Sequence, residues 1–296
     1  MIAPVRTVLV TGGTGLLGRA VLERLAGSAR LVALHRPGGD PPALDRVEWV
    51  AQDLAAPLRD DLPARVDAVL HLAQSRRHRD FPDGAVDTFE VNAAATVRLL
   101  DWCRRAGGRR FVHASSGAVY APGPTPLRED QPPAPPSFYG ETKLAAERAV
   151  RAFGDCFDVA ILRFFFVHGP LQDPGAFIPG LAARVRDGEP IQLRGPEGMR
   201  CNPIAVEDAA AAVEAAWRVE QPAGVVNVAG TEAVTLRALG ERIGALLGVE
   251  PRFAEQPAGE DLVADVTHMH ARLGRPRVGL DEALARTLSR PPRCPS

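Results

Sequence analysis

The chain has 296 residues, of which 46% are hydrophobic, and its formal net charge is −1. This length suits one large α/β unit or one and a half domains, and a charge so near zero gives no reason to expect nucleic acid or an anionic membrane surface as a partner. No apolar run approaches the ~20 residues of a membrane helix, and the first predicted strand leaves no room for a signal peptide, so we expect a cytoplasmic protein without a membrane partner.

The cysteines predict neither a disulfide framework nor a metal site. The chain has four of them, and their spacing fits neither a metal-binding motif nor the paired pattern of small secreted proteins. We expect reduced thiols and no metal. These residues are Cys103, Cys156, Cys201 and Cys294.

A glycine-rich turn joins the first predicted strand to the first predicted helix. Residues 8–10 are apolar and β-branched, which predicts a buried strand, and residues 16–25 repeat apolar side chains at helical spacing. Gly12 permits a tight turn, Gly15 lets the backbone approach a pyrophosphate, and Gly18 lets the helix pack closely on the strand. Strand, turn and helix together predict a dinucleotide site.

The helix that follows this turn begins with Leu16 and Leu17. Unpaired N–H groups at a helix N-terminus, with the positive end of the helix dipole, bind phosphate. The segment TGGTGLLG, residues 11–18, resembles the opening of short-chain dehydrogenase/reductases, the extended branch in particular. The resemblance implies an α/β Rossmann fold with a doubly wound parallel sheet, a smaller C-terminal substrate lobe and an NAD(P) cofactor.

The end of the second predicted strand, residues 31–34, bears on the choice of cofactor. A carboxylate there would accept a hydrogen bond from the ribose 2′-OH and disfavour a 2′-phosphate. This chain has His35 and Arg36 instead, and Arg36 can pair with a 2′-phosphate. The pattern favours NADP over NAD, with the alternative that Arg36 is one of many solvated arginines.

Further cofactor contacts follow from the resemblance. After the third strand, residues 47–50, Asp53 matches the aspartate that hydrogen-bonds the adenine, with Leu54 beside it. The fourth strand, residues 66–73, ends on Ala73, in the stretch that lies along the cofactor. Asn92, in a predicted helix over 86–105, matches an asparagine that supports the active site.

Two nearby features have plainer interpretations. His71, inside the fourth strand, is interpreted as a structural histidine. Residues 76–84 form a polar and basic loop, which we interpret as solvated, with contact to an anionic substrate as the alternative.

A serine, a tyrosine and the only lysine follow the fifth predicted strand, residues 110–114. Ser116 lies just past the strand, and Tyr139 and Lys143 are four residues apart in a predicted helix over 138–153, so they share one face. Their order resembles the catalytic set of the family. The resemblance implies that Tyr139 transfers a proton, Ser116 holds the substrate oxygen, and Lys143 supports the tyrosine and binds the nicotinamide ribose.

The residue types suit this chemistry. A free tyrosine has a pKa of ~10, and a nearby ammonium is expected to lower the pKa of Tyr139 toward its working range. Arginine is a poor substitute for Lys143, because its guanidinium is a rigid fork with a very high pKa.

The sixth predicted strand, residues 159–166, departs from the family pattern at its end. Phe166 stands where nucleotide-sugar enzymes usually have asparagine, and His168 stands for tyrosine. Since that asparagine commonly reaches the nucleotide of the substrate, Phe166 is a candidate substrate contact that weakens the nucleotide-sugar assignment. Arg200 is a candidate for the substrate diphosphate, with an ordinary surface arginine as the alternative.

The resemblance covers essentially the whole chain. It predicts a dinucleotide-binding domain over 1–169, a sheet completed by about 204–230, and a substrate lobe from 170–203 and 231–296. In the family, the helices that carry Asn92 and the Tyr139–Lys143 pair associate across a two-fold axis. We therefore expect a homodimer.

The leading hypothesis is an NAD(P)-dependent enzyme that moves a hydride at a hydroxyl or keto carbon of a nucleotide sugar, as an epimerase or a ketoreductase. Dehydratases of this branch carry an Asp-Glu pair after the catalytic hydroxyl, whereas this chain has Gly117 and Ala118. One alternative is an NADP-dependent reductase of a non-sugar ketone. Another is a redox-sensing binding protein without catalysis, but such relatives typically lose the tyrosine or the lysine.

Overall fold

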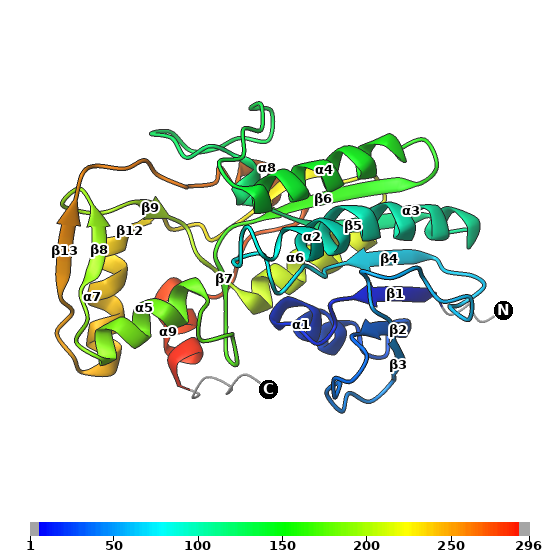
Figure 1. Cartoon of the computed structure of the whole chain (residues 1–296), viewed down its shortest axis with the longest axis horizontal. Helices are drawn as coiled ribbons and strands as arrows, with labels where there is room; N and C mark the ends of the chain where they lie inside the picture. Colours follow the sequence, from blue (N-terminus) through cyan, green and yellow to red (C-terminus); the bar gives the residue numbers. More distant parts are fainter. Residues whose placement is uncertain (1–5, 290–296) are drawn as a thin grey trace.

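The structure, a computed structural model, describes residues 6–289. Seven parallel strands form its central sheet, in the spatial order β3-β2-β1-β4-β5-β6-β11 (Figure 1). The strands are β1 (Thr7–Thr11), β2 (Arg30–His35), β3 (Val47–Ala51), β4 (Ala68–His71), β5 (Arg110–Ser116), β6 (Asp158–Phe164) and β11 (Gly224–Val228). The order reverses beside β1, which confirms the predicted doubly wound α/β sheet.

Helices cover both faces of this sheet. On one face, α1 (Leu16–Leu25) and α6 (Val206–Arg218) pack against each other and share an apolar core with the strands. On the other, α3 (Ala95–Arg105) and α4 (Phe138–Ala152) share a second core with the sheet. Strands covered on both sides need apolar residues at nearly every position, which is why the sequence shows continuous apolar runs there.

The predicted helix over 86–105 is divided by a π-helical turn. It consists of α2 (Ala85–Phe89), the π turn η1 (Glu90–Ala94) and α3. A short 3-10 turn, η2 (Gly117–Val119), follows β5. The predicted sixth strand also ends earlier than expected, since β6 stops at Phe164.

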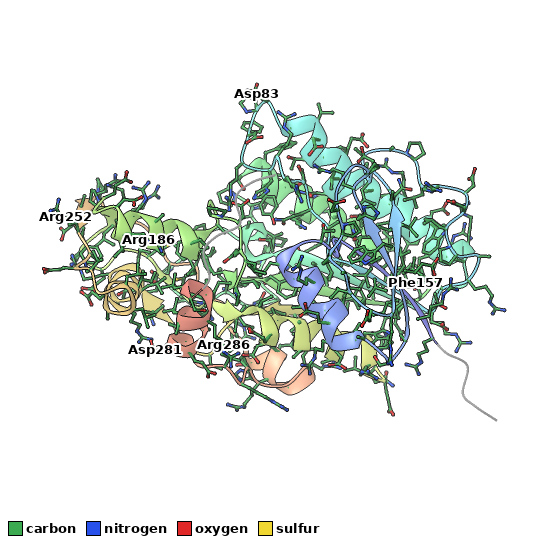
Figure 2. The ribbon with its side chains drawn as sticks, turned by 90° about the horizontal axis from the view of Figure 1, so that it is seen from below. Asp83, Phe157, Arg186, Arg252, Asp281 and Arg286 are labelled. Atoms are coloured by element: carbon green, nitrogen blue, oxygen red, sulfur yellow. The ribbon has the colours of Figure 1, made fainter. Side chains whose placement is uncertain are left out.

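A smaller lobe lies at one end of the molecule (Figure 1). Figure 2 shows Arg186 and Arg252 in this lobe and Phe157 at the opposite end. Its apolar core joins α5 (Phe177–Arg186), α7 (Leu236–Leu247) and α9 (Leu280–Leu288). Thr235 caps α7 by accepting a hydrogen bond from the Ala238 N–H.

Short strand pairs complete the lobe and its connection to the sheet, and one further helix packs against β11 and α6. The pairs are β7 (Val167–His168) with β10 (Ile204–Ala205), β9 (Arg200–Cys201) with β12 (Val234–Thr235), and β8 (Ile191–Arg194) with β13 (Phe253–Gln256); the helix is α8 (Thr267–Arg272). The two-residue strands among these are too short to show a period of two in the sequence.

Cys103 and Cys201 are buried free thiols and Cys156 is an exposed one, whereas Cys294 lies outside the described residues. None of the helices between residues 6 and 289 combines the length and the apolar character that a membrane crossing requires. Over the same range, no cluster of three or more histidine, cysteine, aspartate or glutamate side chains is arranged to hold a metal ion.

Candidate active site

The glycine turn after β1 is shaped by close backbone contacts. Gly12 has a φ of +72°, and a Cβ there would lie 2.7 Å from the Ala73 nitrogen. A Cβ on Gly18 would lie 2.1 Å from the carbonyl oxygen of Gly12, so the helix can approach the turn only with glycine at this place. Gly15 is exposed at the N-cap of α1 and donates its N–H to Gly12 at 3.0 Å.

The N-terminus of α1 is suited to a diphosphate. No side chain caps it, and its first turn holds no acidic residue. The N–H groups at Leu16 and Leu17 therefore keep their positive partial charge without a competing carboxylate. These features fit the pyrophosphate of a dinucleotide.

Three residues predicted to contact the cofactor lie past the ends of β2 and β3. Arg36 and Asp53 are exposed, and Leu54 is buried. The Asp53 carboxylate accepts the Ala55 N–H at 3.0 Å, which fixes the turn after β3. Carboxyl ends of neighbouring parallel strands meet at one sheet edge, so these residues share an edge with the glycine turn.

Ser116 is the last residue of β5 and begins the η2 turn. Its Oγ accepts the Ala118 N–H at 3.1 Å. The next residue, Gly117, has no room for a side chain, because a Cβ would lie 2.5 Å from the Phe165 ring.

Tyr139 lies in the first turn of α4 and points to the carboxyl ends of the central strands. Its hydroxyl donates to Oε1 of Gln74 at 2.8 Å, and its ring centre is 5.0 Å from that of His78. Burial raises the pKa of the phenol to about 12, while a hydrogen bond with Ser116 and the charge of Arg79 act to lower it. The phenol is therefore protonated at neutral pH and can donate a proton.

Lys143 is buried one turn further along α4. Its Nζ donates to the carbonyl of Ala114 at 2.9 Å and lies 6.0 Å from the centre of the Tyr139 ring. Burial lowers the pKa of the ammonium to about 8, and the charge of Glu147 partly opposes this shift. The expected lowering of the tyrosine pKa by Lys143 is not seen: desolvation dominates at the phenol, and the ammonium binds a backbone carbonyl instead.

Asn92 lies in the π turn and connects three segments of the site. Its Oδ1 accepts the Ser75 N–H at 2.9 Å, and its Nδ2 donates to Oγ1 of Thr142 at 3.0 Å. The asparagine thereby fixes the chain after β4 to the helix that carries Tyr139 and Lys143. π turns inside helices are frequent at functional sites.

The structure has a buried ion pair beneath the site that the sequence did not predict. Arg163 of β6 and Glu147 of α4 are both fully buried and joined by two hydrogen bonds, of 2.8 and 2.6 Å. Glu147 also accepts the Ser115 hydroxyl at 2.5 Å, and Arg163 donates to the Tyr120 hydroxyl at 2.5 Å. The signal in the sequence is an arginine within an otherwise apolar strand.

Gln74, the partner of the Tyr139 hydroxyl, also escaped sequence analysis, because a glutamine after a strand carries no periodic signal. His71 has the structural role expected of it. Its ring nitrogens lie 2.7 Å from Thr11 Oγ1 and 3.0 Å from Thr96 Oγ1, and burial lowers its pKa to about 3.

The predicted substrate residues lie toward the lobe. Phe166 has a φ of +45°, which is strained for a bulky residue, and its ring centre is 4.8 Å from that of Phe177 in α5. Arg200 is exposed in β9, where its N–H donates to the Asp261 carboxylate at 2.7 Å. His168 binds Thr287 of α9 at 2.9 Å and so joins the sheet side to the lobe.

The fold and this set of side chains define an NAD-dependent enzyme of the extended short-chain dehydrogenase/reductase type. The sequence model of the NAD dependent epimerase/dehydratase family matches residues 8–229, and the chain belongs to this family.

Its relatives include the low-salt glycan biosynthesis protein Agl12 of Haloferax volcanii, 31% identical over 86% of this chain and 87% of that protein. A UDP-glucose 4-epimerase of Mycolicibacterium smegmatis is 29% identical over 95% and 96%. A UDP-glucose 4-epimerase of Azospirillum brasilense is 37% identical, but the match covers 55% of this chain and 49% of the relative.

Among solved structures, MoeE5 in complex with UDP-glucuronic acid and NAD is 31% identical and superposes with a TM-score of 0.82, covering 96% of this chain and 98% of MoeE5. These likenesses confirm the expected family, the Rossmann architecture and the class of enzyme. They give no support to a preference for NADP over NAD.

Proposed function

We propose that this chain is an NAD-dependent 4-epimerase of a nucleoside-diphosphate sugar. The observation that carries the proposal is the meeting of Ser116, Tyr139 and Lys143 at the sheet edge that also bears the glycine turn. The relatives named as UDP-glucose 4-epimerases support it, as does MoeE5 with its bound UDP-sugar and NAD.

The glycine turn and the N–H groups of Leu16 and Leu17 would hold the pyrophosphate of NAD. Asp53 and Leu54 would contact the adenine side. The nicotinamide side would lie along Ala73 near Asn92, with its ribose on Tyr139 and Lys143. When bound, NAD supplies the hydride acceptor and donor.

The side chains of the protein transfer the proton of the substrate oxygen. The hydroxyl of Ser116 would hold the substrate oxygen beside the Tyr139 phenol, whose pKa this serine acts to lower. In an epimerase, oxidation and reduction take place on the same sugar carbon, so the proton removed from the oxygen must return to it. Tyr139 takes the proton in its phenolate form when the substrate is oxidised and returns it when the intermediate is reduced, and the ammonium of Lys143 would have to favour that phenolate against the desolvation that keeps the phenol protonated.

The surroundings of Ser116 argue against a dehydratase. Such enzymes of this branch place an acid pair directly after the catalytic hydroxyl, and Gly117 and Ala118 occupy these positions here. The Phe165 ring lies where the first acidic side chain would begin, so the site cannot regain that residue by a single substitution.

Phe166 favours a second candidate, the reduction of a non-sugar ketone. Its ring packs on Phe177 and offers an apolar wall where an asparagine would offer hydrogen bonds. In this function, reduced cofactor would be consumed with each turnover. In an epimerase, the bound cofactor would be regenerated.

Two measurements on one preparation separate the two candidates. The purified protein is denatured and its bound nucleotide identified, and native enzyme is given UDP-glucose or UDP-glucuronic acid without added cofactor. The 4-epimerase proposal predicts retained NAD and conversion to the C4 epimer of at least one sugar. Absence of conversion, with turnover of ketones that depends on added NADPH, would establish the reductase instead.

Selection of NADP by Arg36 is a separate proposal that would favour the second candidate, the ketone reductase, because the 4-epimerase proposed above retains NAD. It rests on the missing carboxylate at the end of β2 and on the exposure of Arg36. It predicts tighter binding of NADPH than of NADH, and loss of that difference in Arg36→Ala. Tighter NADH binding in the wild-type protein would contradict it.

We also propose a homodimer formed through the helices that carry Asn92 and the Tyr139–Lys143 pair, and Arg200 as a contact of the substrate diphosphate. Exposed apolar side chains on α2 and α3 support the dimer: Val86 is 78% exposed, Phe89 49% and Val97 47%. Light scattering should show two chains per particle at micromolar concentration. Arg200→Gln should raise KM for the nucleotide sugar more than it lowers kcat.

A further inference from the structure

The loop between β4 and α2, residues 76–84, lies beside the catalytic tyrosine. The ring centre of His78 is 5.0 Å from that of Tyr139, and the ring centre of Phe81 is 5.3 Å from that of Phe138. Figure 2 shows Asp83, near the end of this loop, projecting from the Rossmann body beside α2. The loop therefore forms one side of the place where the reacting sugar would lie.

Buried hydrogen bonds fix the base of this loop. The Ser75 N–H donates to Asn92, the Ser75 hydroxyl donates to Asp87, and Nδ1 of His78 lies 2.8 Å from the carbonyl of Ser75. The Arg77 N–H donates back to Ser75 Oγ at 3.0 Å. A loop held in this way presents its side chains to the site in a set position.

Two of the three arginines of the loop, Arg77 and Arg79, differ in their partners. Arg77 pairs with Asp80 at 3.4 Å and donates to the Asp83 carbonyl at 3.1 Å, so its charge is used within the loop. Within residues 6–289, no carboxylate lies within ion-pair distance of Arg79. Its NH1 donates to the carbonyl of Gly175, just before α5, at 2.5 Å, and its charge acts on the Tyr139 phenol.

An acidic side chain beside Gly175 is already engaged. The Asp173 carboxylate accepts the Gly175 N–H at 2.8 Å. The Arg79 guanidinium uses one of its five N–H donors on Gly175, and the remaining donors are left for a ligand. An uncompensated guanidinium next to the catalytic phenol fits a carboxylate, which it can bind through two parallel hydrogen bonds.

We propose that Arg79 selects a substrate whose sugar carries a carboxylate, so that the enzyme acts on a nucleoside-diphosphate uronic acid in preference to the neutral hexose. The inference rests on the proposed 4-epimerase function. In a hexopyranose, the carbon that bears the acidic or hydroxymethyl group is the direct neighbour of C4. A group beside Tyr139 is therefore within reach of that substituent when the C4 oxygen lies on Tyr139 and Ser116.

The test compares two sugars and three forms of the enzyme. The ratio of kcat/KM for UDP-glucuronic acid to that for UDP-glucose is measured in wild type, Arg79→Gln and the matched control Arg77→Gln. Wild type should favour the uronic acid. Arg79→Gln should lower the ratio about 10- to 100-fold, the range for a lost hydrogen bond to a charged group, and Arg77→Gln should leave it unchanged.

The outcomes also separate this inference from the function on which it rests. Turnover with a ratio that favours UDP-glucose, or with equal ratios in wild type and Arg79→Gln, overturns the role of Arg79 and leaves the epimerase standing. If wild type neither binds nor converts either sugar, both proposals fail. Thermal melting of the three proteins shows whether a lower rate reflects unfolding.

Discussion

The two faces of the central sheet differ in a way that separates stability from chemistry. On the face covered by α1 and α6, the core residues of the strands are apolar, as in Val8, Val10 and Leu70, and a charged group, Arg110, contacts α6 only where β5 begins. On the face covered by α3 and α4, the strands change from apolar to polar toward their carboxyl ends. On this face of β1, the next residue after Leu9 is Thr11, and on the same face of β4 the next after Val69 is His71. In β5, Phe111 is succeeded on this face by His113 and Ser115, and in β6, Ile161 is succeeded by Arg163.

The polar face works as a buried support for the site. Most of its groups are hydrogen-bonded through Glu147, Asn92 and Thr96, which lie on the helices that carry or flank Tyr139 and Lys143; within residues 6–289, neither ring nitrogen of the buried His113 has a hydrogen-bond partner. Hydrogen bonds are directional, so the paired groups specify one arrangement of the helices against the sheet. The apolar face sets no such requirement, because apolar contacts are not directional.

The largest effect is expected for the substitution Tyr139→Phe, in the helix α4 that covers the polar face. Removing the phenolic proton should lower kcat by about 10²–10⁴-fold, the contribution of general acid–base catalysis, with little change in melting temperature or NAD affinity. Tyr120→Phe is the matched control, because Tyr120 binds Arg163 and Asn227 within the support. It should lower stability by about 1–3 kcal/mol and spare most of kcat. Near-normal kcat in a folded Tyr139→Phe enzyme would refute the mechanism.

Lys143→Arg keeps the charge but changes its shape. The buried ammonium reaches the Ala114 carbonyl as a compact group, and a planar guanidinium does not fit that position. We expect loss of most activity together with weaker NAD binding, which separates this residue from Tyr139. Steady-state kinetics and a cofactor titration on the same preparation measure both. Unchanged NAD affinity would remove the lysine from the cofactor site.

Breaking the Arg163–Glu147 ion pair should lower the free energy of unfolding more than it lowers the catalytic rate. Glu147→Gln leaves the fully buried Arg163 without a counter-charge, and we expect a loss of about 3–5 kcal/mol in the free energy of unfolding. The control is Glu48→Gln, which removes the exposed pair with Arg30 and should cost less than about 1 kcal/mol. Urea unfolding of both variants gives the comparison, and equal losses would contradict it.

A further effect on stability concerns pH. Burial lowers the pKa of His71 to about 3 and that of His168 to about 4, against an ordinary value of about 6.5 in the unfolded chain. Below pH 6.5 the unfolded state therefore binds protons that the folded state does not. Stability is fully present above pH 6.5 and is lost as the pH falls toward the folded pKa values, by about 1.4 kcal/mol per pH unit for each histidine.

This loss can be measured by urea unfolding at pH 7, 6 and 5, a range in which ordinary carboxylates stay ionised. His168→Gln keeps a polar partner for Thr287 and should make the decline less steep. A free energy of unfolding that does not change between pH 7 and 5 would show that these histidines are protonated in the folded protein.

Sequence patterns located the parts of the site that depend on local chain geometry. The glycines at 12, 15 and 18, the strand end at Ser116 and the helical spacing of Tyr139 and Lys143 are all readable within a few residues. The same patterns missed Gln74 and the Arg163–Glu147 pair, because these partners are far apart in the chain and meet only when β4, β6 and α4 are packed.

By itself, the sequence determined the alternation of strands and helices and the family, since apolar periodicity and glycine spacing are local properties of the chain. Only the tertiary structure decided how the site behaves. Burial of Tyr139 outweighs the charge expected from Lys143, the backbone of Phe166 is held in a strained conformation, and Arg79, in a loop interpreted as solvated, acts through its charge on the Tyr139 phenol. Each of these results depends on which groups surround a residue in space, and the order of residues along the chain does not record that.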